Sequence, residues 1–279
     1  MIRVFLQGGL GNQMFQYAAG RALADKHKTA LCLDTSWYHY PVKRKFELDK
    51  FRIHAQTEKS FLSFLAYNIW NRPGFGEKHS CIFREKAGGQ VDALFDLHDN
   101  VEIIGYFMSE RFFPTVADAI RAELGFEHRN VSRETESILS DVGSGNSVAM
   151  HVRRGDFLEL KNYQVCTEAY YFRGLDYVRA RVDNPRFYLF SDDPTWCRTV
   201  FSDDDCCVVE VTQSRDDSLN DMHLMSSCQH MIMSNSSYSW WAAWLGQTPD
   251  QIVVAPDRWL NSDPMNYIFC SDWIKLSAS

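Results

Sequence analysis

The chain has 279 residues, of which 45% are hydrophobic and 14% aromatic, enough for one large globular domain or two modest ones. Its 29 basic and 36 acidic residues give a net charge of −7, which excludes a general attraction for nucleic acid or anionic lipid. Any anion that the protein binds must therefore be held by a local group of residues.

The apolar runs and the cysteines predict a cytoplasmic protein without an integral membrane segment. The apolar run in the opening MIRVFLQGG is too short for a signal peptide, and no later uncharged run approaches the ~18 apolar residues of a membrane span. The eight cysteines are scattered and form no CxxC pair, a usage typical of buried thiols in a reducing compartment. Peripheral contact with a membrane-borne substrate stays open.

The chain opens with a strand–helix–strand unit. An apolar strand at residues 2–6 precedes a helix at 12–28, whose apolar residues recur at helical spacing, and a second strand at 30–33. This order predicts a parallel sheet with a right-handed crossover. Residues 34–100 lack clean periodicity apart from a helix predicted at 61–70, and we expect the least regular structure there.

The next segments lead to a predicted domain boundary. A strand at 101–106 and a helix at 114–124 precede a polar stretch that contains a short helix and ends in the turn-forming residues GSGN. We therefore expect an N-terminal domain over residues 1–145 and a C-terminal domain over 146–279.

The predicted C-terminal domain alternates regularly between strands and helices. The strands are predicted at 147–152, 186–190, 207–211, 230–233 and 251–254. The intervening helices are predicted at 167–182, from Pro194, at 217–229 and at 239–245. This alternation predicts an open, doubly wound α/β sheet, in which ligands bind beyond the carboxyl ends of the strands.

The first of these strands runs into HVRRGD, residues 151–156. An arginine at the carboxyl end of a strand suits fork-like recognition of an anion such as phosphate. Structural salt bridges, including one from Asp156 to Arg154, explain the same residues equally well. The motif therefore indicates either an anion site or a set of structural ion pairs.

Two further strands end in polar motifs. In SDDP, either Asp192 or Asp193 caps the helix that Pro194 begins, whereas a projecting carboxylate can accept hydrogen bonds from a guanine edge. SNSSYS, residues 234–239, precedes an apolar helix, and capping needs only one of its serines. The surplus of hydroxyls favours a diphosphate site at the start of that helix.

The stretch GGLGN, residues 8–12, links the first strand to the first helix. A tight turn explains its glycines, and so does a backbone site for a phosphate or a sugar. It misses the dinucleotide pattern GxGxxG because Met14 replaces the last glycine, and no GxSxG or GxxxxGK[ST] motif occurs. The acidic run Asp203–Asp205 falls at the wrong end of its strand for a ligand, so we expect no metal site.

The motifs GGLGNQMFQYAAGRALA, HVRRGDF, SDDP and DMHLMSSCQHMIMSNSSYSWWAAWL together resemble the α-1,2-fucosyltransferases of glycosyltransferase family 11. The resemblance runs from residue 8 to about 245, and residues 34–100 carry little of it. It implies an α/β fold of the GT-B type, with two Rossmann-like domains facing across a cleft. It also implies inverting transfer of L-fucose from the donor substrate GDP-β-L-fucose, without a metal or another cofactor.

The resemblance further implies roles for individual residues. Arg153 would contact the diphosphate, His151 would lie near the ribose or guanine, and Asp192 would read the guanine edge. The full donor-binding set is Gly8, Gly9, Gly11, Asn12, His151, Arg153, Arg154, Asp192, Ser236 and Ser237. Arg153 and Asn12 are expected to act in catalysis, and Asp156 and Glu159 are alternative general bases beside a weakly assisted dissociative route.

The expected reaction is fucosylation of the 2-hydroxyl of a terminal galactose in a surface polysaccharide or oligosaccharide. One alternative is a transferase that uses another GDP-deoxysugar or makes another fucose linkage. A second is a non-catalytic carbohydrate-binding protein in which Trp240, Trp241 and Trp244 form a platform for sugars. The helical spacing of these tryptophans favours a place in the core instead.

Overall fold

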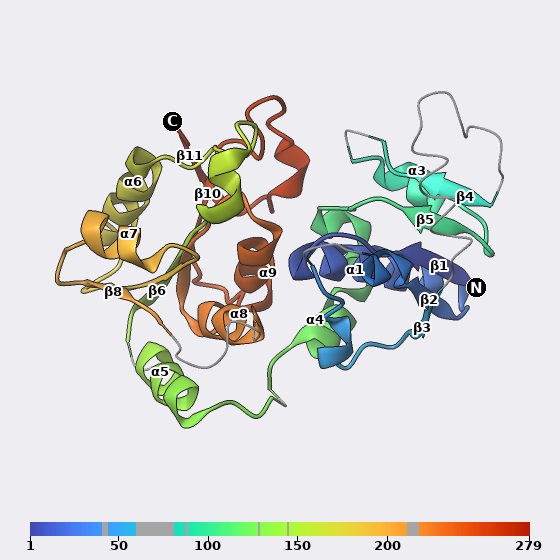
Figure 1. The fold of residues 1–279 in the computed structure, drawn as a ribbon, viewed down its shortest axis with the longest axis horizontal. Helices are drawn as coiled ribbons and strands as arrows, with labels where there is room; N and C mark the ends of the chain where they lie inside the picture. Colours follow the sequence, from blue (N-terminus) through green and yellow to red (C-terminus); the bar gives the residue numbers. More distant parts are fainter. Residues whose placement is uncertain (41–43, 60–80, 87–88, 128, 144, 211–217) are drawn as a thin grey trace. The chain divides into compact units, whose positions relative to one another are not determined.

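The computed structural model of the chain describes residues 1–40, 44–59, 81–86, 89–127, 129–143, 145–210 and 218–279. The chain forms two compact units, Met1–Gly125 and Phe126–Ser279 (Figure 1). Each unit contains one parallel β-sheet with helices packed against it, which confirms the α/β prediction. The helix predicted at 61–70 lies outside the described residues.

The first unit is built on a five-stranded sheet in the order β3-β2-β1-β5-β4. Its strands are β1 (Ile2–Phe5), β2 (Leu31–Asp34), β3 (Gln56–Glu58), β4 (Ile82–Arg84) and β5 (Glu102–Ile104). Its helices are α1 (Leu10–His27), α3 (Val91–Phe95) and α4 (Ala117–Leu124). The predicted β1-α1-β2 unit is confirmed, with β1 and β2 parallel. The sequence pattern missed β3, β4 and α3 because elements of three to five residues are too short to show a period.

The second unit is built on a six-stranded sheet in the order β11-β10-β9-β6-β7-β8. Its strands are β6 (Ser147–Val152), β7 (Arg186–Ser191), β8 (Cys206–Val208), β9 (His230–Ile232), β10 (Val253–Pro256) and β11 (Ile274–Leu276). Its helices are α5 (Arg133–Gly143), α6 (Glu168–Arg179), α7 (Pro194–Val200), α8 (Ser218–Ser227) and α9 (Ser237–Leu245). The five strands of the predicted series are confirmed, and β11 is an additional edge strand.

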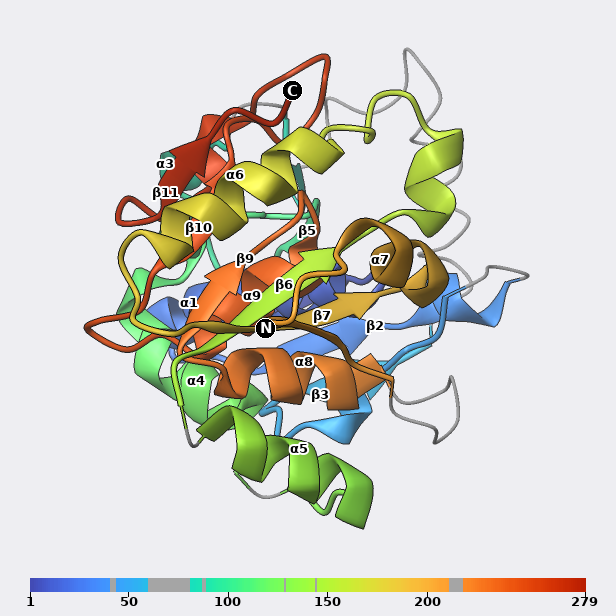
Figure 2. The ribbon, with the colours of Figure 1, turned by 90° about the vertical axis from the view of Figure 1, so that its left-hand side faces the viewer.

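Helices cover both faces of the second sheet. Figure 2 shows α6 above the strands and α8 with α5 below them. The face under α6 and α7 is filled by aromatic and aliphatic side chains, among them Tyr170, Leu175, Phe187 and Phe201. All six residues of β6 are buried, as a central strand covered on both faces requires.

The division between the units lies earlier than the sequence pattern predicts. The boundary predicted after residue 145 is corrected to Gly125, because α5 belongs with the second unit. α5 packs against α8, and Asp141 on α5 accepts a hydrogen bond of 2.6 Å from the Tyr188 hydroxyl on β7. The turn-forming residues around 143–146 therefore connect α5 to β6 inside one unit.

The three tryptophans of α9 belong to the core. Trp240, Trp241 and Trp244 are at most 2% exposed, and the Trp240 indole donates a 2.8 Å hydrogen bond to the Ile268 carbonyl. The alternative in which these side chains form a sugar platform is therefore wrong. Among the described residues, no helix has the length and apolar content needed to cross a bilayer.

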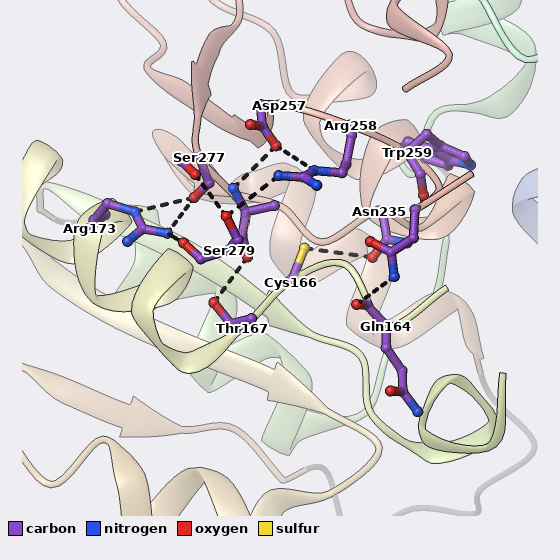
Figure 3. Close-up of polar contacts among 12 residues, drawn as sticks. Gln164, Cys166, Thr167, Arg173, Asn235, Asp257, Arg258, Trp259, Ser277 and Ser279 are labelled. Atoms are coloured by element: carbon purple, nitrogen blue, oxygen red, sulfur yellow. Dashed lines mark hydrogen bonds and ion pairs between the residues drawn. The ribbon is translucent and has the colours of Figure 1, made fainter. Parts of the chain in front are cut away.

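Asn235 joins three segments of the second unit below the start of α9. Its side chain is 2% exposed and donates hydrogen bonds to the carbonyls of Tyr163 (3.1 Å) and Trp259 (2.9 Å). Its Oδ1 accepts a contact from the Cys166 thiol (Figure 3). The same view shows residues 277–279 held by Thr167 and by Arg173 on α6.

We expect Asn235→Ala to lower the free energy of unfolding by about 1–3 kcal/mol, because two carbonyl groups would lose their donor in a dry environment. Asn261→Ala is the matched control, since the exposed Asn261 amide also bonds two carbonyls, those of Lys161 and Gln164. Water replaces that exposed donor, so the control should stay within about 0.5 kcal/mol of the original protein. Urea titration measures both, and equal losses would contradict the role of Asn235.

Candidate functional site at the sheet switch points

The predicted C-terminal residues gather where the strand order of the second sheet reverses. From β6 the chain adds β7 and β8 on one side, and then β9, β10 and β11 on the other. The carboxyl ends of β6 and β9 therefore flank the switch point, which is the usual ligand site of open α/β sheets. His151 on β6 and Ser234 after β9 meet there, with Nδ1 and Oγ 2.9 Å apart.

His151 is a buried, neutral group at this point. It is 6% exposed, and burial, followed by the charge of Arg153, lowers its pKa to about 3. Its ring lies 5.7 Å from that of Tyr238, measured between centroids. An uncharged imidazole can donate from one nitrogen and accept at the other, as recognition of a ribose hydroxyl or a base edge requires.

Arg153 lies just beyond the end of β6 and is held by two carboxylates. Its Nη1 is 2.9 Å from Oδ2 of Asp192, and Nη2 contacts Oδ1 of Asp156. The guanidinium carbon also lies 5.6 Å from the centroid of the Phe157 ring. The side chain remains 23% exposed, so its planar donor fork is oriented in advance and open to an anion.

Asp192 is positioned by the loop that follows β6. Its Oδ1 accepts a hydrogen bond of 2.9 Å from the Arg154 main-chain N–H. A Cβ on Gly155 would lie 2.4 Å from Oδ2 of Asp192, so only glycine allows this close approach. The structure thus brings Asp192 to Arg153 at the strand ends.

Asp193 and Arg154 form a separate, structural pair. Asp193 caps α7 by accepting from the Trp196 N–H at 3.1 Å, which confirms that one aspartate of SDDP is a helix cap. It also pairs with Nε of Arg154 at 3.1 Å, and the Arg154 guanidinium stacks 3.9 Å from the Trp196 ring. The predicted Asp156–Arg154 salt bridge is wrong, because the 3₁₀ helix Gly155–Glu159 turns Asp156 back to Arg153.

The serine segment divides into buried and accessible members. Ser234 and Ser239 are fully buried, and their hydroxyls lie 3.4 Å apart in a network that continues to His151. Ser236 caps α9 by accepting from the Tyr238 N–H at 3.3 Å, and Ser237 is the first residue of the helix. Ser236 and Ser237 are half-buried, so they and the positive end of α9 can meet an anion.

The remaining acidic candidates occupy different environments. Asp156 is engaged with Arg153, whereas Glu159 is exposed at the end of its 3₁₀ helix. The run Asp203–Asp205 lies before β8 and holds Arg179 through Asp203 and Asp205, at 2.8 and 2.7 Å. Within the described ranges, no group of three or more His, Cys, Asp or Glu residues is arranged to hold a metal ion.

The GGLGN stretch lies at the switch point of the first sheet, between β1 and β5. Gly8 has φ +84°, and a Cβ there would lie 2.6 Å from Nδ2 of Asn12, so glycine is required. Gly9 precedes α1, Gly11 is buried in its first turn, and Asn12 is half-buried. The Asn12 side chain therefore folds back over the turn rather than along the helix.

Three side chains that the motif analysis missed hold this turn. Gln13 donates to the carbonyls of Gly8 (3.3 Å) and Lys45 (2.8 Å), and the Tyr38 hydroxyl also donates to Gly8, at 3.1 Å. Gln16 accepts from the Gln7 N–H at 3.1 Å and donates to the Gly105 carbonyl at 3.0 Å. The sequence signal for this role is the presence of two glutamines on an otherwise apolar face of the first helix.

Arg44 is a further residue that the sequence motifs do not indicate. Its guanidinium lies about 4 Å from the position that a Cβ of Gly9 would occupy, close to the start of α1. Residues 34–100 show no period or motif that singles it out. The first unit thus has a cation of its own beside the GGLGN turn.

Comparison with known proteins agrees with the fold and the motifs. The model of glycosyl transferase family 11 matches residues 1–277. The alpha-1,2-colitosyltransferase of Escherichia coli is 33% identical and is aligned over 94% of this chain and 93% of its own length. The galactoside alpha-(1,2)-fucosyltransferase 1 of Homo sapiens is 28% identical over 99% of this chain and 74% of its own.

Solved structures share the fold at low sequence identity. The alpha-1,6-fucosyltransferase NodZ soaked with GDP-fucose matches with a TM-score of 0.51 and 17% identity, over 91% of this chain and 94% of that one. POFUT1 in complex with GDP matches with a TM-score of 0.51 and 12% identity, over 91% and 97%. The fold is thus the GT-B-type α/β fold of these fucosyltransferases, and the chain belongs to glycosyltransferase family 11.

Proposed function

We propose that this protein transfers L-fucose from GDP-β-L-fucose to the 2-hydroxyl of a terminal galactose, with inversion at the anomeric carbon. The observation that supports this proposal most directly is that Arg153 and the serine-rich start of α9 both lie at the switch point of the second sheet. The proposal is also supported by relatives that are named as α-1,2-glycosyltransferases and that align with most of this chain. The acceptor belongs to a surface polysaccharide or oligosaccharide.

The transfer reaction requires a cation beside the donor bond that is cleaved. Cleavage of the bond between C1 and the diphosphate builds negative charge on GDP, while the sugar acquires oxocarbenium character. Arg153, the hydroxyls of Ser236 and Ser237 and the amides of the first turn of α9 stabilise that charge. Asp156 and Asp192 hold the Arg153 guanidinium, and in this proposal the diphosphate replaces them as its partner.

The same proposal assigns the other predicted contacts. Neutral His151 faces the ribose or guanine, and Asp192, released from Arg153, accepts from the guanine edge. Gly8, Gly9, Gly11 and Asn12 present the first unit's turn to the sugar diphosphate. The Arg154 side chain supports the loop through Asp193 and Trp196.

A second candidate donor is GDP-colitose. A relative that is 33% identical over 94% of this chain is an alpha-1,2-colitosyltransferase, and colitose differs from fucose by lacking the 3-hydroxyl. The experiment that tests the function offers both nucleotide sugars with methyl β-galactoside and determines the linkage of any product. Transfer of fucose to the 2-hydroxyl supports the proposal. Exclusive use of GDP-colitose would show instead that GDP-colitose is the donor.

We expect Arg153→Ala to reduce kcat/KM by about 10²–10³-fold, because the leaving diphosphate loses its main cation. Arg179→Ala is the matched control, since Arg179 also pairs with two aspartates and lies outside the switch point. Initial rates of GDP release with the galactoside measure both variants. Substantial activity in Arg153→Ala would contradict its assignment.

We expect full activity in excess EDTA, because protein groups alone stabilise the departing GDP. The measurement compares transfer rates with EDTA, and with Mn²⁺ added back, on the same enzyme preparation. A strict requirement for Mn²⁺ would overturn this part of the proposal.

We expect Asn12→Ala to lower the transfer rate by about 10²-fold, since a hydrogen bond to the sugar diphosphate would be lost. Circular dichroism and thermal unfolding check that the Gly8 turn is retained in the variant. Normal fucose transfer by a folded Asn12→Ala protein would remove Asn12 from the mechanism.

A further inference from the structure

A carboxylate at the switch point of the first sheet has no part in the donor chemistry above. Glu85 directly follows β4, and its main-chain N–H bonds the Ile104 carbonyl at the end of β5, at 2.9 Å. Its Oε2 accepts from the N–H groups of Tyr106 (2.7 Å) and Phe107 (2.8 Å). Two main-chain donors thus fix the carboxylate in one orientation.

The second oxygen of this carboxylate is available for an external donor. Among the described residues, the hydrogen bonds recorded for the Glu85 side chain are the two on Oε2, and no cation is paired with it. Burial raises the pKa of the Glu85 carboxyl above its ordinary value, against the lowering effect of the two N–H groups. A carboxylate whose pKa is raised by burial is a stronger base than an exposed one.

The position of Glu85 is coupled to the GGLGN turn through Gly105. A Cβ on Gly105 would lie 2.4 Å from Cβ of Glu85, so the absence of a side chain lets the carboxylate reach the loop. The Gly105 carbonyl accepts from Gln16, whose Oε1 accepts from the Gln7 N–H beside the turn. The loops after β1, β4 and β5 are thus held together at one edge of the sheet.

One of the two residues that fix the carboxylate also carries an accessible aromatic ring. Tyr106, whose N–H is bonded to Glu85, is 39% exposed, unlike the fully buried Phe107. The phenols of Tyr106 and Tyr38 are close enough to interact electrostatically, and Tyr38 bonds the Gly8 carbonyl. A sugar presents an apolar face and hydroxyl donors, so an exposed aromatic ring and an oriented carboxylate on adjoining loops suit its binding.

We propose that Glu85 and Tyr106 form the acceptor-sugar site, in which Tyr106 stacks on the galactose ring and Glu85 Oε1 receives the proton of the attacking hydroxyl. This inference rests on the proposed transferase function. As the acceptor oxygen bonds to C1 of the donor sugar, the C1–phosphate bond breaks and its electron pair leaves with GDP. The hydroxyl proton moves to Glu85, which then releases it to water. In this proposal the general base is Glu85 of the first unit, and Asp156 serves as a partner of Arg153.

The test is Glu85→Gln, which keeps a carbonyl oxygen for the Tyr106 and Phe107 N–H groups and places an NH₂ group at the position of Oε1. We expect the transfer rate to methyl β-galactoside to fall by about 10²-fold or more. The dissociation constant for GDP should stay within about twofold of that of the original enzyme, because GDP binding depends on the leaving-group site. Glu102→Gln is the matched control, a half-buried carboxyl at the start of β5 whose pKa is likewise raised by burial.

The pH profile separates a base from a support of the loop. The original enzyme should lose kcat/KM as the pH falls through the raised pKa of Glu85, because only the ionised form accepts a proton. Glu85→Gln should lack this acidic limb. Tyr106→Ala should raise the KM of the galactoside about tenfold and leave the KM of the donor unchanged, and Tyr106→Phe should keep both.

Two results would overturn the inference. One is an unchanged transfer rate and acidic limb in Glu85→Gln, and the other is a loss of GDP binding as large as the loss of transfer, which indicates a loop support only. Failure of the original enzyme to transfer any sugar to the galactoside would instead reject the proposed function itself. The assays are run on the original enzyme first, so the two failures are distinguished.

Discussion

The parallel pairing of β6 with β9 is the constraint on which the second unit depends. Because the chain builds outward from β6 in two directions, the carboxyl ends of these strands are free of a direct connection and can hold side chains instead. The buried contact between His151 and Ser234 links the two ends. It fixes the loop that begins with Arg153 relative to the first turn of α9, so that a guanidinium and a helix terminus serve one site.

Carboxylates of the protein orient the arginine at this site. Arg153 is held by Asp156 and Asp192, and Asp192 is in turn held by the Arg154 main chain. These contacts keep the planar guanidinium at the carboxyl end of β6. Arg154, next in sequence, stacks on Trp196 and pairs with Asp193. The two adjacent arginines thus have different partners: Arg153 pairs with Asp156 and Asp192, and Arg154 with Asp193 and Trp196.

The first unit uses its own switch point differently. There the GGLGN turn is held by buried amides, Gln13 and Gln16, and an acidic group, Glu85, follows the edge strand β4 and bonds the loop after β5. Buried amides orient a backbone turn without adding charge, whereas the Glu85 carboxyl has a pKa that burial raises against the lowering effect of its two N–H donors. Each unit thus places a different kind of group at the carboxyl ends of its strands: a guanidinium in the second unit and a carboxylate in the first.

The sequence by itself determined the parts that depend on local pattern. Alternating apolar strands and periodic helices predicted the α/β class and the bounds of β6, and SDDP predicted a cap that the structure assigns to Asp193. Motifs at strand ends identified Arg153 and the serines, because parallel strands bring their carboxyl ends to one edge. Only the tertiary structure decided which carboxylate pairs with which arginine, where the first unit ends, and that Glu85 meets Tyr106. These outcomes depend on contacts between segments far apart in sequence, such as α5 with α8 and β4 with β5, which leave no local signal.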